Sequence, residues 1–365
     1  MSEWQTFCLK DLGKIVGGAT PPTNNPKNYG NKIAWITPKD LSTLQGRYIK
    51  KGSRSISRLG FKSCSCVLLP KHAILFSSRA PIGYVAIAKK RLCTNQGFKS
   101  IIPNKKIYFE FLYYLLKYHK DNISNIGGGT TFKEVSGATL GLFKVKIPPT
   151  YYEQQKIART LSVLDQKIEN NHKINELLHT IAYKIYEYYF KYKPKNAKLE
   201  QIIIENPKSS IMVKNAQKTQ DKYPFFTSGD NTLSYPKAII DGRNCFLNTG
   251  GNAGIKFYVG KASYSTDTWC ICANEFSDYL YLLLSSIKTH INQSFFQGTS
   301  LKHLQKNLLK KYPIYMPSAH EIKKFNQIMM PLLTLISINT RTSKKLEQIR
   351  DFLLPLLLKQ QVKPK

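Results

Sequence analysis

One pattern is written twice in this sequence, and it restricts the chain to folds that contain two copies of one architecture. The segment Gly129-Thr130-Thr131-Phe132-Lys133 is matched by Gly298-Thr299-Ser300-Leu301-Lys302 at an offset of 169 residues. Pro148 and Pro317 keep that offset, and Glu153 corresponds to Glu321 at an offset of 168. The same offset relates Ile168, Asn171, Leu178 and Ile181 to Ile336, Asn339, Leu346 and Ile349. The chain is therefore predicted to contain a long internal duplication.

The repeat weakens toward the beginning of each copy. Ile82-Gly83 corresponds to Ala253-Gly254, and Asn95-Gln96-Gly97-Phe98 corresponds to Thr266-Asp267-Thr268-Trp269, now at an offset of 171 residues. The copies differ most between Ile15 and Pro70 in the first and between Ile202 and Asp241 in the second. Two halves that share a scaffold and diverge in one segment are expected to hold the same shape and to read different targets.

Each copy begins with a region of mixed secondary structure. Short apolar and β-branched stretches predict strands, and longer amphipathic stretches predict helices. In the first copy the predicted strands are 33–37, 73–76 and 84–88, followed by a helix over 107–118. In the second copy they are 245–247, 257–259 and 269–272, followed by a helix over 278–291. The same order of elements is therefore predicted twice, in two α+β domains.

A long helix with a regular apolar stripe follows each mixed domain. Apolar residues recur at alternating intervals of four and three, which is the pattern of a coiled-coil seam. The proposed helix-pair spacer residues are Leu164, Ile168, Asn171, Leu178 and Ile185 in the first copy, and Leu332, Ile336, Asn339, Leu346 and Leu353 in the second. Polar Asn171, Asn175, Asn339 and Ser343 interrupt the seams at equivalent places, where they can fix the register. Ordinary amphipathic core helices remain an alternative.

Capping signals and prolines divide the chain into four segments. Ser162 with Asp165 resembles an N-terminal cap, and Pro331 is tolerated only in a first helical turn, so we expect each long helix to begin near these residues. A shorter helix, over 153–161 and 321–329, would precede each one. The predicted segments are a domain at 1–150, a spacer helix at 151–193, a second domain at 194–318, and a second spacer helix with a tail at 319–365.

The charge balance points to a polyanionic partner. The chain carries 55 Lys and Arg against 22 Asp and Glu, for a formal charge of +33. Such a field attracts nucleic acid, although a membrane surface or a ribosomal role also accommodates basicity. The N-terminal residues lack a basic leader and an apolar stretch, and no run approaches the ~18 apolar residues of a membrane span. We therefore expect a cytoplasmic protein.

The seven cysteines do not form a metal-binding pattern. Cys64 and Cys66, like Cys270 and Cys272, are spaced as side chains on the same face of a strand. A zinc site would normally need further Cys or His at paired spacing, and the His residues are scattered singly. We expect packed free thiols and no metal site.

The ordered series of motifs resembles a known family. The series is Gly128-Gly129-Thr130-Thr131-Phe132-Lys133, then Lys146-Ile147-Pro148-Pro149, Glu153-Gln154-Gln155-Lys156-Ile157-Ala158, and Leu164-Asp165-Gln166-Lys167-Ile168-Glu169-Asn170-Asn171. It is similar to the unit of target recognition domain plus spacer helix in the DNA-specificity (S) subunits of Type I restriction-modification systems. A degraded second copy runs from Gly298 to Ile349, so the resemblance spans nearly the whole chain.

The resemblance implies a fold, a function and partners. The fold would be two α+β target recognition domains in a pseudo-two-fold arrangement, separated by two long antiparallel coiled-coil helices. Each domain would read one half of a bipartite, asymmetric site in double-stranded DNA. Two adenine-methylating modification subunits and restriction-translocation subunits would be the partners. The chain would have no catalytic residue and no cofactor, because S-adenosylmethionine, ATP and Mg²⁺ would be bound by those subunits.

Three short segments of the first domain and two of the second contain the candidate DNA contacts. In Gly127 to Lys133 and Gln297 to Lys302, glycines permit close backbone approach, hydroxyls can donate to phosphate oxygens and lysine supplies charge, although a helix-capping turn is an equal alternative. Arg79 can grip guanine or phosphate from a turn between strands, where the second copy has Asn252. Asn95 and Gln96 suit adenine edges or a structural turn. The proposed DNA-binding residues are Arg79, Asn95, Gln96, Thr130, Thr131, Lys133, Asn252, Thr299, Ser300 and Lys302.

Rival functions lack their defining motifs. Asn206-Pro207-Lys208-Ser209 does not match the adenine-gripping motif of a methyltransferase, and Gly254 to Ala262 is a poor match to a phosphate-binding loop. The alternative that remains is a stand-alone basic RNA-binding protein or nuclease with duplicated domains. The two heptad seams favour the specificity subunit, because a helical spacer suits two separated half-sites.

Overall fold

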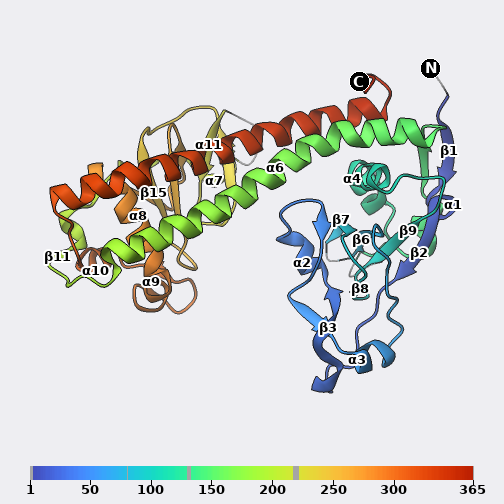
Figure 1. The fold of residues 1–365 in the computed structure, drawn as a ribbon, viewed down its shortest axis with the longest axis horizontal. Coiled ribbons are helices and arrows are strands. Elements are labelled where there is room, and N and C mark those ends of the chain that lie inside the picture. The colour runs from blue at the N-terminus through green and yellow to red at the C-terminus, as the bar shows by residue number, and fades with distance from the viewer. Residues whose placement is uncertain (1–2, 80, 130–132, 217–221, 365) are drawn as a thin grey trace. The chain divides into compact units, whose positions relative to one another are not determined.

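The computed structural model describes residues 3–79, 81–129, 133–216 and 222–364. The chain divides into two compact units: unit 1 comprises Met1–Asn170 with Ser343–Lys365, and unit 2 comprises Asn171–Thr342. Each unit contains one mixed domain and stretches of two long helices, α6 (Tyr151–Tyr186) and α11 (Ala319–Leu358) (Figure 1). The α+β class predicted from the sequence is confirmed.

Both long helices begin at the same kind of cap. The Thr150 hydroxyl accepts a hydrogen bond from Glu153 N at 3.2 Å, and the Ser318 hydroxyl accepts one from Glu321 N at 3.4 Å. Each glutamate in turn accepts a hydrogen bond from the capping hydroxyl. The capping hydroxyl thereby satisfies one backbone donor that the first turn of each helix leaves without an intrahelical partner, and the glutamate holds that hydroxyl in place. α6 ends in a π-helical turn, Glu187–Lys191.

The expected break near the start of each long helix is wrong. Ser162 lies inside α6, where its hydroxyl donates to Arg159 O at 3.2 Å, and Pro331 lies inside α11. The residues on either side of Pro331 include Phe325, Met329 and Leu333, which are all buried in one apolar cluster. Packing of this face outweighs the cost of about 3 kcal/mol that an interior proline imposes, so the helix continues through it.

Unit 1 is built on a five-stranded sheet with the order β2-β9-β6-β7-β4 and a three-stranded sheet with the order β5-β3-β8. The bounds are β2 (Gly13–Gly17), β3 (Tyr29–Ile36), β4 (Tyr48–Ile49), β5 (Arg54–Ile56), β6 (Ile74–Ser78), β7 (Ile82–Ala88), β8 (Cys93–Thr94) and β9 (Lys99–Pro103). β1 (Gln5–Cys8) pairs with β10 (Lys144–Ile147). All five side chains of β6 are buried, as expected for a central strand covered on both faces.

Unit 2 repeats this topology without the strand that corresponds to β4, among the described residues. A four-stranded sheet has the order β12-β18-β15-β16, a three-stranded sheet has the order β14-β13-β17, and β11 pairs with β21. The bounds are β11 (Ala197–Lys198), β12 (Ile204–Glu205), β13 (Tyr223–Phe226), β14 (Thr232–Tyr235), β15 (Arg243–Asn248), β16 (Ile255–Val259), β17 (Ser263–Tyr264), β18 (Thr268–Cys272), β19 (Phe296–Gln297), β20 (His303–Leu304) and β21 (Pro313–Ile314). In each unit the middle strand of the smaller sheet has one antiparallel and one parallel neighbour.

Helices cover the larger sheets. α4 (Phe109–Asn125) packs in unit 1 against Ile74, Ile87 and Ile101, and α8 (Ser277–Ser286) packs in unit 2 against Cys245, Leu247 and Ile271. The helix predicted over 278–291 is divided, because α9 (Lys288–Ser294) follows α8 after Ile287. The shorter helices are α1 (Leu9–Leu12), α2 (Pro38–Ser42), α3 (Arg58–Lys62), α5 (Gly137–Leu142), α7 (Val213–Ala216) and α10 (Lys306–Lys310), with 3-10 turns at Pro26–Asn28, Leu199–Gln201 and Asn274–Phe276.

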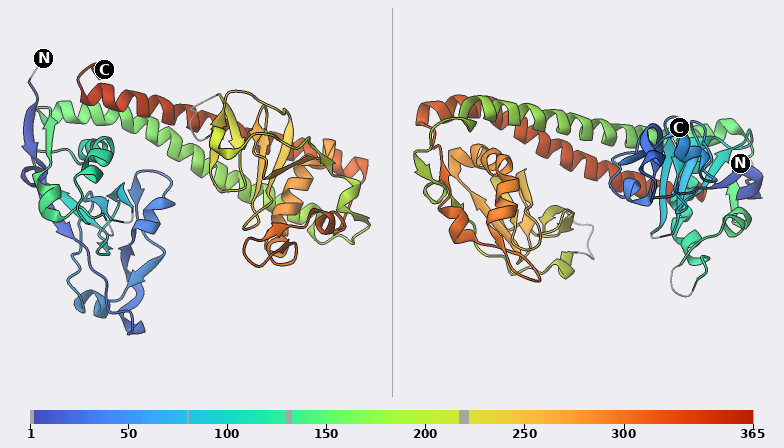
Figure 2. Two further views of the ribbon diagram at one scale, coloured as in Figure 1. Left: turned by 180° about the vertical axis from the view of Figure 1, so that it is seen from behind. Right: turned by 90° about the horizontal axis from the view of Figure 1, so that it is seen from below.

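Within each unit the stretches of α6 and α11 run antiparallel, side by side (Figure 2). In unit 2, Asn175 bonds Asn339 at 3.0 Å, and the rings of Phe190 and Phe325 lie 5.0 Å apart. In unit 1, Arg350 Nη1 bonds Asp165 Oδ1 at 2.6 Å. In unit 1, Ile157 and Leu357 also line one cavity, so in each unit the residue numbers of neighbouring positions rise along α6 and fall along α11.

All seven cysteines are free, as expected. Cys270 and Cys272 lie in β18, but Cys64 and Cys66 follow α3 outside any strand. The Cys64 thiol donates to Gly60 O and the Cys66 thiol to Ala19 O, so loop contacts place them. Over the described ranges no three His, Cys, Asp or Glu side chains are grouped so that they could hold a metal ion. Nor does any helix in those ranges have the length and apolarity to cross a membrane.

Candidate nucleic-acid interface

Three loops far apart in the sequence meet in unit 1 at the end of the central strand β6 of the larger sheet. Ser78, at the end of β6, donates its N–H to Gly97 O at 2.8 Å and accepts one from Val135 N at 3.0 Å. Gly128 and Glu134 exchange backbone hydrogen bonds of 3.0 and 2.8 Å, which close the base of the glycine-rich loop. These contacts bring the turn after β6, the turn before β9 and the glycine-rich loop together.

A fourth loop comes from the segment in which the two copies differ most. Ala19 N donates to Thr94 O at 3.0 Å, and the Thr20 hydroxyl donates to the Gln96 side chain. A Cβ at Gly18 would lie only 2.0 Å from Asn95 O, so only glycine permits this approach. We name residues 18–20, 78–79, 95–97, 99, 127–129 and 133–134 loop cluster 1.

Loop cluster 1 contains four of the six DNA-contact candidates of the first copy. Arg79, Gln96 and Lys133 reach the surface, whereas Asn95 is half-buried and its Oδ1 accepts a hydrogen bond from Gly97 N at 3.0 Å. This contact favours the structural turn at Asn95 over an adenine contact. Thr130 and Thr131 lie outside the described residues. The assignment of individual DNA contacts stays a prediction.

The charges of loop cluster 1 leave it positive. Arg79 Nη1 lies 3.7 Å from Glu134 Oε2, and Lys99 Nζ lies 3.4 Å from Glu134 Oε1. One carboxylate is thus shared by two cations, and the exposed Lys133 adds a third positive charge. Because Arg79 remains more than one third exposed, its pairing with Glu134 orients the guanidinium without removing it from solvent.

Unit 2 assembles the same loops from different residues. Leu304 N donates to Thr249 O, and Gly251 N donates to Lys302 O, both at 2.9 Å. The Thr249 hydroxyl donates to Asp267 O at 2.6 Å. The turn after β15, the turn before β18 and the loop between β19 and β20 therefore meet as their counterparts do in unit 1.

The divergent segment reaches this cluster as well. The Ser228 hydroxyl accepts a hydrogen bond from Thr249 N at 3.0 Å. Lys256 Nζ donates to Thr227 O at 2.9 Å and to Asn248 Oδ1 at 3.0 Å, and burial lowers the pKa of this lysine. We name residues 227–229, 248–252, 256, 266–268 and 298–303 loop cluster 2.

Ser77 and Asn248 show how two sequences produce one turn. The Ser77 hydroxyl donates to Pro81 O at 2.8 Å, and the Asn248 amide donates to Asn252 O at 3.1 Å. In both units the bond spans four residues, and a glycine follows the turn. Gly83 has a φ of +100°, and a Cβ at Gly254 would lie 2.3 Å from Asn248 Nδ2. Glycine is required at both places, which explains why this pair survives in the repeat.

The four candidates of the second copy lie together in loop cluster 2 and are exposed: Asn252, Thr299, Ser300 and Lys302. Gly298 has a φ of +141°, and a Cβ there would lie 2.5 Å from Leu301 O, so the loop requires glycine at its start. Sequence reasoning missed Thr20, Lys99, Ser228 and Lys256. Thr20 bonds Gln96, which lies 76 residues away, and Lys99 pairs with Glu134, which lies 35 residues away. Ser228 bonds Thr249, 21 residues away, and Lys256 bonds Thr227 and Asn248, which lie 29 and 8 residues away.

The comparisons with known proteins identify the family. The model of the type I restriction modification DNA specificity domain matches residues 1–180 and 195–348. The chain belongs to the type I restriction-modification specificity subunits. It is 33% identical to the type I restriction enzyme MjaIX specificity subunit of Methanocaldococcus jannaschii, an alignment that covers 98% of this chain and 93% of the relative.

Two further relatives agree with this assignment. The type I restriction enzyme HindI specificity subunit of Haemophilus influenzae is 30% identical over 46% of this chain and 37% of its own length. The crystal structure of a type I restriction-modification S subunit from M. genitalium superimposes with a TM-score of 0.63 at 19% sequence identity, covering 98% of this chain and 96% of that one. The latter shows a shared fold. The predicted identity as a DNA-specificity subunit is confirmed.

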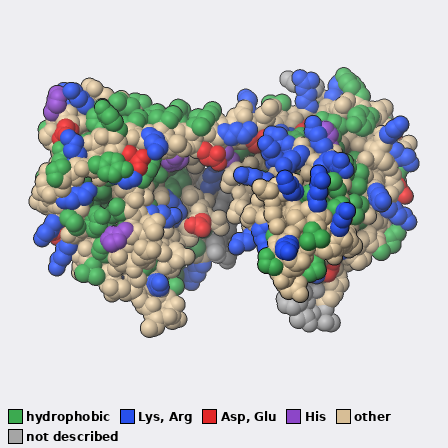
Figure 3. All heavy atoms as spheres, turned by 60° about the horizontal axis from the view of Figure 1, so that its bottom comes forward, with side chains coloured by type: hydrophobic (Ala, Val, Ile, Leu, Met, Phe, Trp, Pro, Cys, Tyr) green, Lys and Arg blue, Asp and Glu red, His purple; other side chains and the backbone are tan. Residues whose placement is uncertain are grey.

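Positive side chains gather on the surface of this specificity subunit. On the face shown in Figure 3, Lys and Arg crowd over unit 1, the right-hand body, and Asp and Glu are sparse there. This agrees with the excess of 55 basic over 22 acidic residues in the chain. A surface of this kind raises the local concentration of a polyanion and speeds its association.

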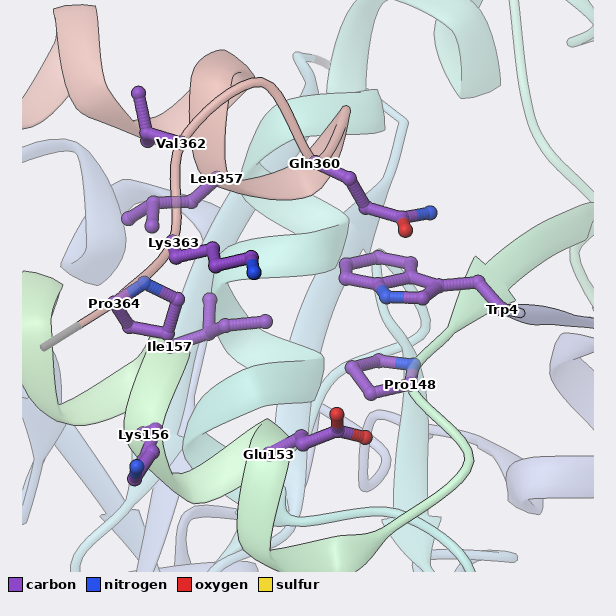
Figure 4. A pocket seen from close by; sticks show the side chains of 10 residues that line it. All are labelled: Trp4, Pro148, Glu153, Lys156, Ile157, Leu357, Gln360, Val362, Lys363 and Pro364. Carbon is purple, nitrogen blue, oxygen red and sulfur yellow. The ribbon is translucent and has the colours of Figure 1, made fainter. Parts of the chain in front are cut away.

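The candidate interface is a surface of loops and not a closed pocket. A cavity of about 260 Å³ in unit 1 is lined by Trp4 before β1, by Pro148 and the first turns of α6, and by the end of α11 with the residues that follow it. Figure 4 shows the Trp4 ring between the Gln360 amide and the Pro148 ring. None of its lining residues belongs to loop cluster 1. The cavity lies between α6 and the segments near the two ends of the chain, and it is separate from the candidate DNA contacts.

The proposed spacer residues all face inward to some degree. Ile168 and Ile336 are buried, and the other eight are half-buried: Leu164, Asn171, Leu178, Ile185, Leu332, Asn339, Leu346 and Leu353. In unit 2 the polar residues of the two seams bond across the helix pair. Asn339 Nδ2 donates to Asn175 Oδ1, and Asn175 Nδ2 donates to Ile336 O at 3.3 Å. Only one relative shift of the helices allows both bonds, so the pair can fix the register.

The two exposed lysines of the loop clusters should contact phosphate. We expect Lys133→Ala or Lys302→Ala to weaken DNA binding about equally for specific and unrelated sequences, and to lower the slope of log K against log salt by about one. Titration of fluorescent duplexes at several salt concentrations measures both effects. Exposed Lys345 on α11 provides the control, and Lys345→Ala should leave the slope unchanged. A change in sequence preference would instead assign base reading to Lys133 or Lys302.

Proposed function

We propose that this specificity subunit binds a bipartite, asymmetric DNA site, with one half read by each domain. The observation that carries the proposal is that each unit builds a similar loop cluster at the end of equivalent strands of its own larger sheet, from different residues. Equivalent scaffolds place the loops, and the divergent segments 15–70 and 202–241 supply part of each cluster. Two unlike half-sites follow from two unlike loop clusters.

The chemistry of the loops suits reading of a duplex. Glycines at positive φ allow the backbone to approach phosphate, and exposed lysines supply charge. The partly exposed Arg79 and the exposed Gln96 and Asn252 carry the donors and acceptors that recognise base edges. Phosphate contacts would hold each domain in register, and the side chains of the divergent segments would distinguish the bases. RNA binding or nuclease activity by a stand-alone protein has no observation in its favour.

The proposal assigns methylation, ATP hydrolysis and cleavage to partner subunits. The specificity-domain model takes up most of this chain, so we infer that it is non-catalytic and that S-adenosylmethionine, ATP and Mg²⁺ are held by two modification subunits and by restriction-translocation subunits. In unit 2, α6 and α11 each expose apolar side chains at heptad-like spacing, which supports partner docking: Ile174, Leu177, Ile181, Ile328, Leu335 and Ile338. We also propose that the complex, which assembles on DNA, is cytoplasmic.

Mapping of methylated adenine across the genome tests this function. In cells that contain the chain with its modification subunits, we expect one motif made of two short unlike sequences separated by a gap of fixed length. Deletion of this chain alone should abolish methylation of that motif, and a plasmid copy should restore it. Methylation that persists without the chain would contradict the proposal, as would a motif in one continuous block.

A further inference from the structure

In each unit, one arginine of the mixed domain bonds a long helix and also a carboxylate on the domain's own helix. In unit 1 this residue is Arg47, which immediately precedes β4 and is only 5% exposed. Its Nε donates to Glu169 Oε1 on α6, and its Nη1 donates to Glu110 Oε1 at the start of α4, both at 3.1 Å. Its backbone N–H also donates to Glu169 Oε1 at 2.9 Å. We name Arg47, Glu110 and Glu169 clamp 1.

The backbone beside Arg47 is shaped for this contact. Gly46 has a φ of +109°, and a Cβ there would lie 2.9 Å from Glu169 Cγ. The loop can therefore approach α6 only with glycine at this position. Arg47 O accepts a hydrogen bond from Ile87 N at 2.8 Å, which ties the same residue to β7. The large sheet of unit 1 is thereby linked to α6 through one residue.

In unit 2 the corresponding residue is Arg243, the first residue of β15. Its Nε and Nη2 donate to the two oxygens of Asp278 at the start of α8, each at 2.6 Å. Its Nη1 donates to the Thr334 hydroxyl on α11 at 2.9 Å, and Nη2 also reaches Met330 O at 3.3 Å. Asp278 is buried, which raises its pKa, while the bonds from Arg243 oppose that rise. We name Arg243, Asp278 and Thr334 clamp 2.

A second backbone contact accompanies clamp 2. Val259 N donates to the Ser337 hydroxyl at 3.0 Å, and the neighbouring Gly260 has a φ of +123° beside Arg341. Ser337 occupies the position in the second copy that Glu169 occupies in the first, at the offset of 168 residues. The same place on each long helix therefore receives a backbone N–H from its domain, next to a glycine in the left-handed region.

The two arginines are not copies of each other. Glu110 and Asp278 correspond at an offset of 168 residues. Arg47 precedes β4, the fifth strand of its sheet, whereas Arg243 begins β15, and among the described residues the larger sheet of unit 2 has four strands. The halves thus reach one arrangement of bonds from different loops. A buried ion pair adds little net stability compared with apolar packing, so stability alone is a poor explanation for two such clamps. The fixed geometry of the guanidinium bonds is a better explanation for the two clamps.

We propose that clamps 1 and 2 are positioning devices that fix the angle of each domain on its long helix, and thereby limit the gap accepted between the two half-sites. The inference rests on the proposed function. Apolar contacts alone are non-directional and allow a domain to roll on a helix, whereas a planar guanidinium with several fixed donors does not. Arg47 and Arg243 act on DNA recognition through this orientation and not by touching bases.

The test removes the helix side of a clamp and leaves the domain intact. The variant Thr334→Val with Ser337→Ala abolishes the hydroxyls that accept from Arg243 and Val259 but keeps the Arg243–Asp278 pair. In unit 1, Glu169→Ala provides an independent variant. The full chain with its modification subunits and labelled S-adenosylmethionine is assayed on duplexes that carry both half-sites with the native gap or with gaps altered by one or two base pairs. The matched control is Thr342→Val, which removes an exposed hydroxyl of α11.

We expect the preference for the native gap over a gap altered by one base pair to fall by roughly tenfold in each clamp variant, with half-site sequences unchanged. Thr334→Ser with Ser337 intact should restore the preference. A loss of methylation that is equal at all gaps would mean a merely structural role and would overturn the proposal, as would an unchanged preference or altered half-site sequences. If the wild-type complex shows no gap preference, the proposed function itself fails.

Discussion

Replacement of Asp165 by alanine should lower the free energy of unfolding of unit 1 by about 3 kcal/mol. Asp165 is 4% exposed and joins three helices. Its Oδ2 accepts a hydrogen bond from the Tyr114 hydroxyl of α4, and its Oδ1 accepts one from Arg350 of α11, both at 2.6 Å. Burial and this carboxylate raise the pKa of Tyr114. Without Asp165, a mostly buried guanidinium loses its main partner and a buried hydroxyl loses its acceptor, and both losses destabilise the unit.

Urea unfolding followed by tryptophan fluorescence measures this loss, because Trp4 lies beside the end of α11 in unit 1. The control is Asp121→Ala on α4, where the side chain is exposed and the expected change is within about 0.5 kcal/mol. Asp165→Asn should fall between the two, because the amide oxygen still accepts one hydrogen bond but the charge is lost. A value for Asp165→Ala equal to that of the control would contradict the role assigned to this carboxylate.

Removal of one heptad from α6, together with the seven residues of α11 that pair with it, should shorten the gap in the recognised site by about three base pairs. Seven helical residues span about 10.5 Å, and successive base pairs lie about 3.4 Å apart. Deletion of a whole heptad keeps the seam positions in phase, so both helices can still pair. The original site should then no longer be methylated, which makes the expected effect on activity nearly complete.

Genome-wide mapping of methylated adenine in cells with the shortened chain reads out the new gap directly. Both half-site sequences should be the same as in the parent, because neither loop cluster is touched. Deletion of three or four residues instead of seven is the control, since it rotates the seam out of phase and should abolish methylation. An unchanged gap after the heptad deletion would show that the long helices do not set the spacing.

The parts of the fold that are predictable from the sequence depend on local patterns. The β15 and β18 strands appear as short apolar runs, and the internal duplication predicts the same order of strands and helix in both domains. The beginnings of the long helices were missed although Thr150 with Glu153 and Ser318 with Glu321 carry a capping-box pattern. Ser162 with Asp165 has a similar pattern, and only burial of the surrounding apolar face shows that it lies inside a helix.

In the candidate interface, too, only the residues that local sequence patterns mark can be predicted. Arg79, Lys133 and Lys302 were found because glycines and a turn mark their loops in the sequence itself. Thr20 and Ser228 are not predictable in this way, because nothing near them in the sequence indicates that they reach loop cluster 1 and loop cluster 2. Arg47 and Glu169 lie 122 residues apart, and Arg243 and Thr334 lie 91 residues apart, so their pairing follows only from the folded domain resting on its helix.

The central claim is that each domain reads its own half of the site, and exchange of one domain tests it most directly. Residues 194–318 are replaced by the corresponding domain of the Methanocaldococcus jannaschii relative, and methylated adenine is mapped in cells that contain the chimaera with the original modification subunits. We expect a new motif in which one half is replaced and the other half is unchanged. A motif altered in both halves, or in neither, would contradict it.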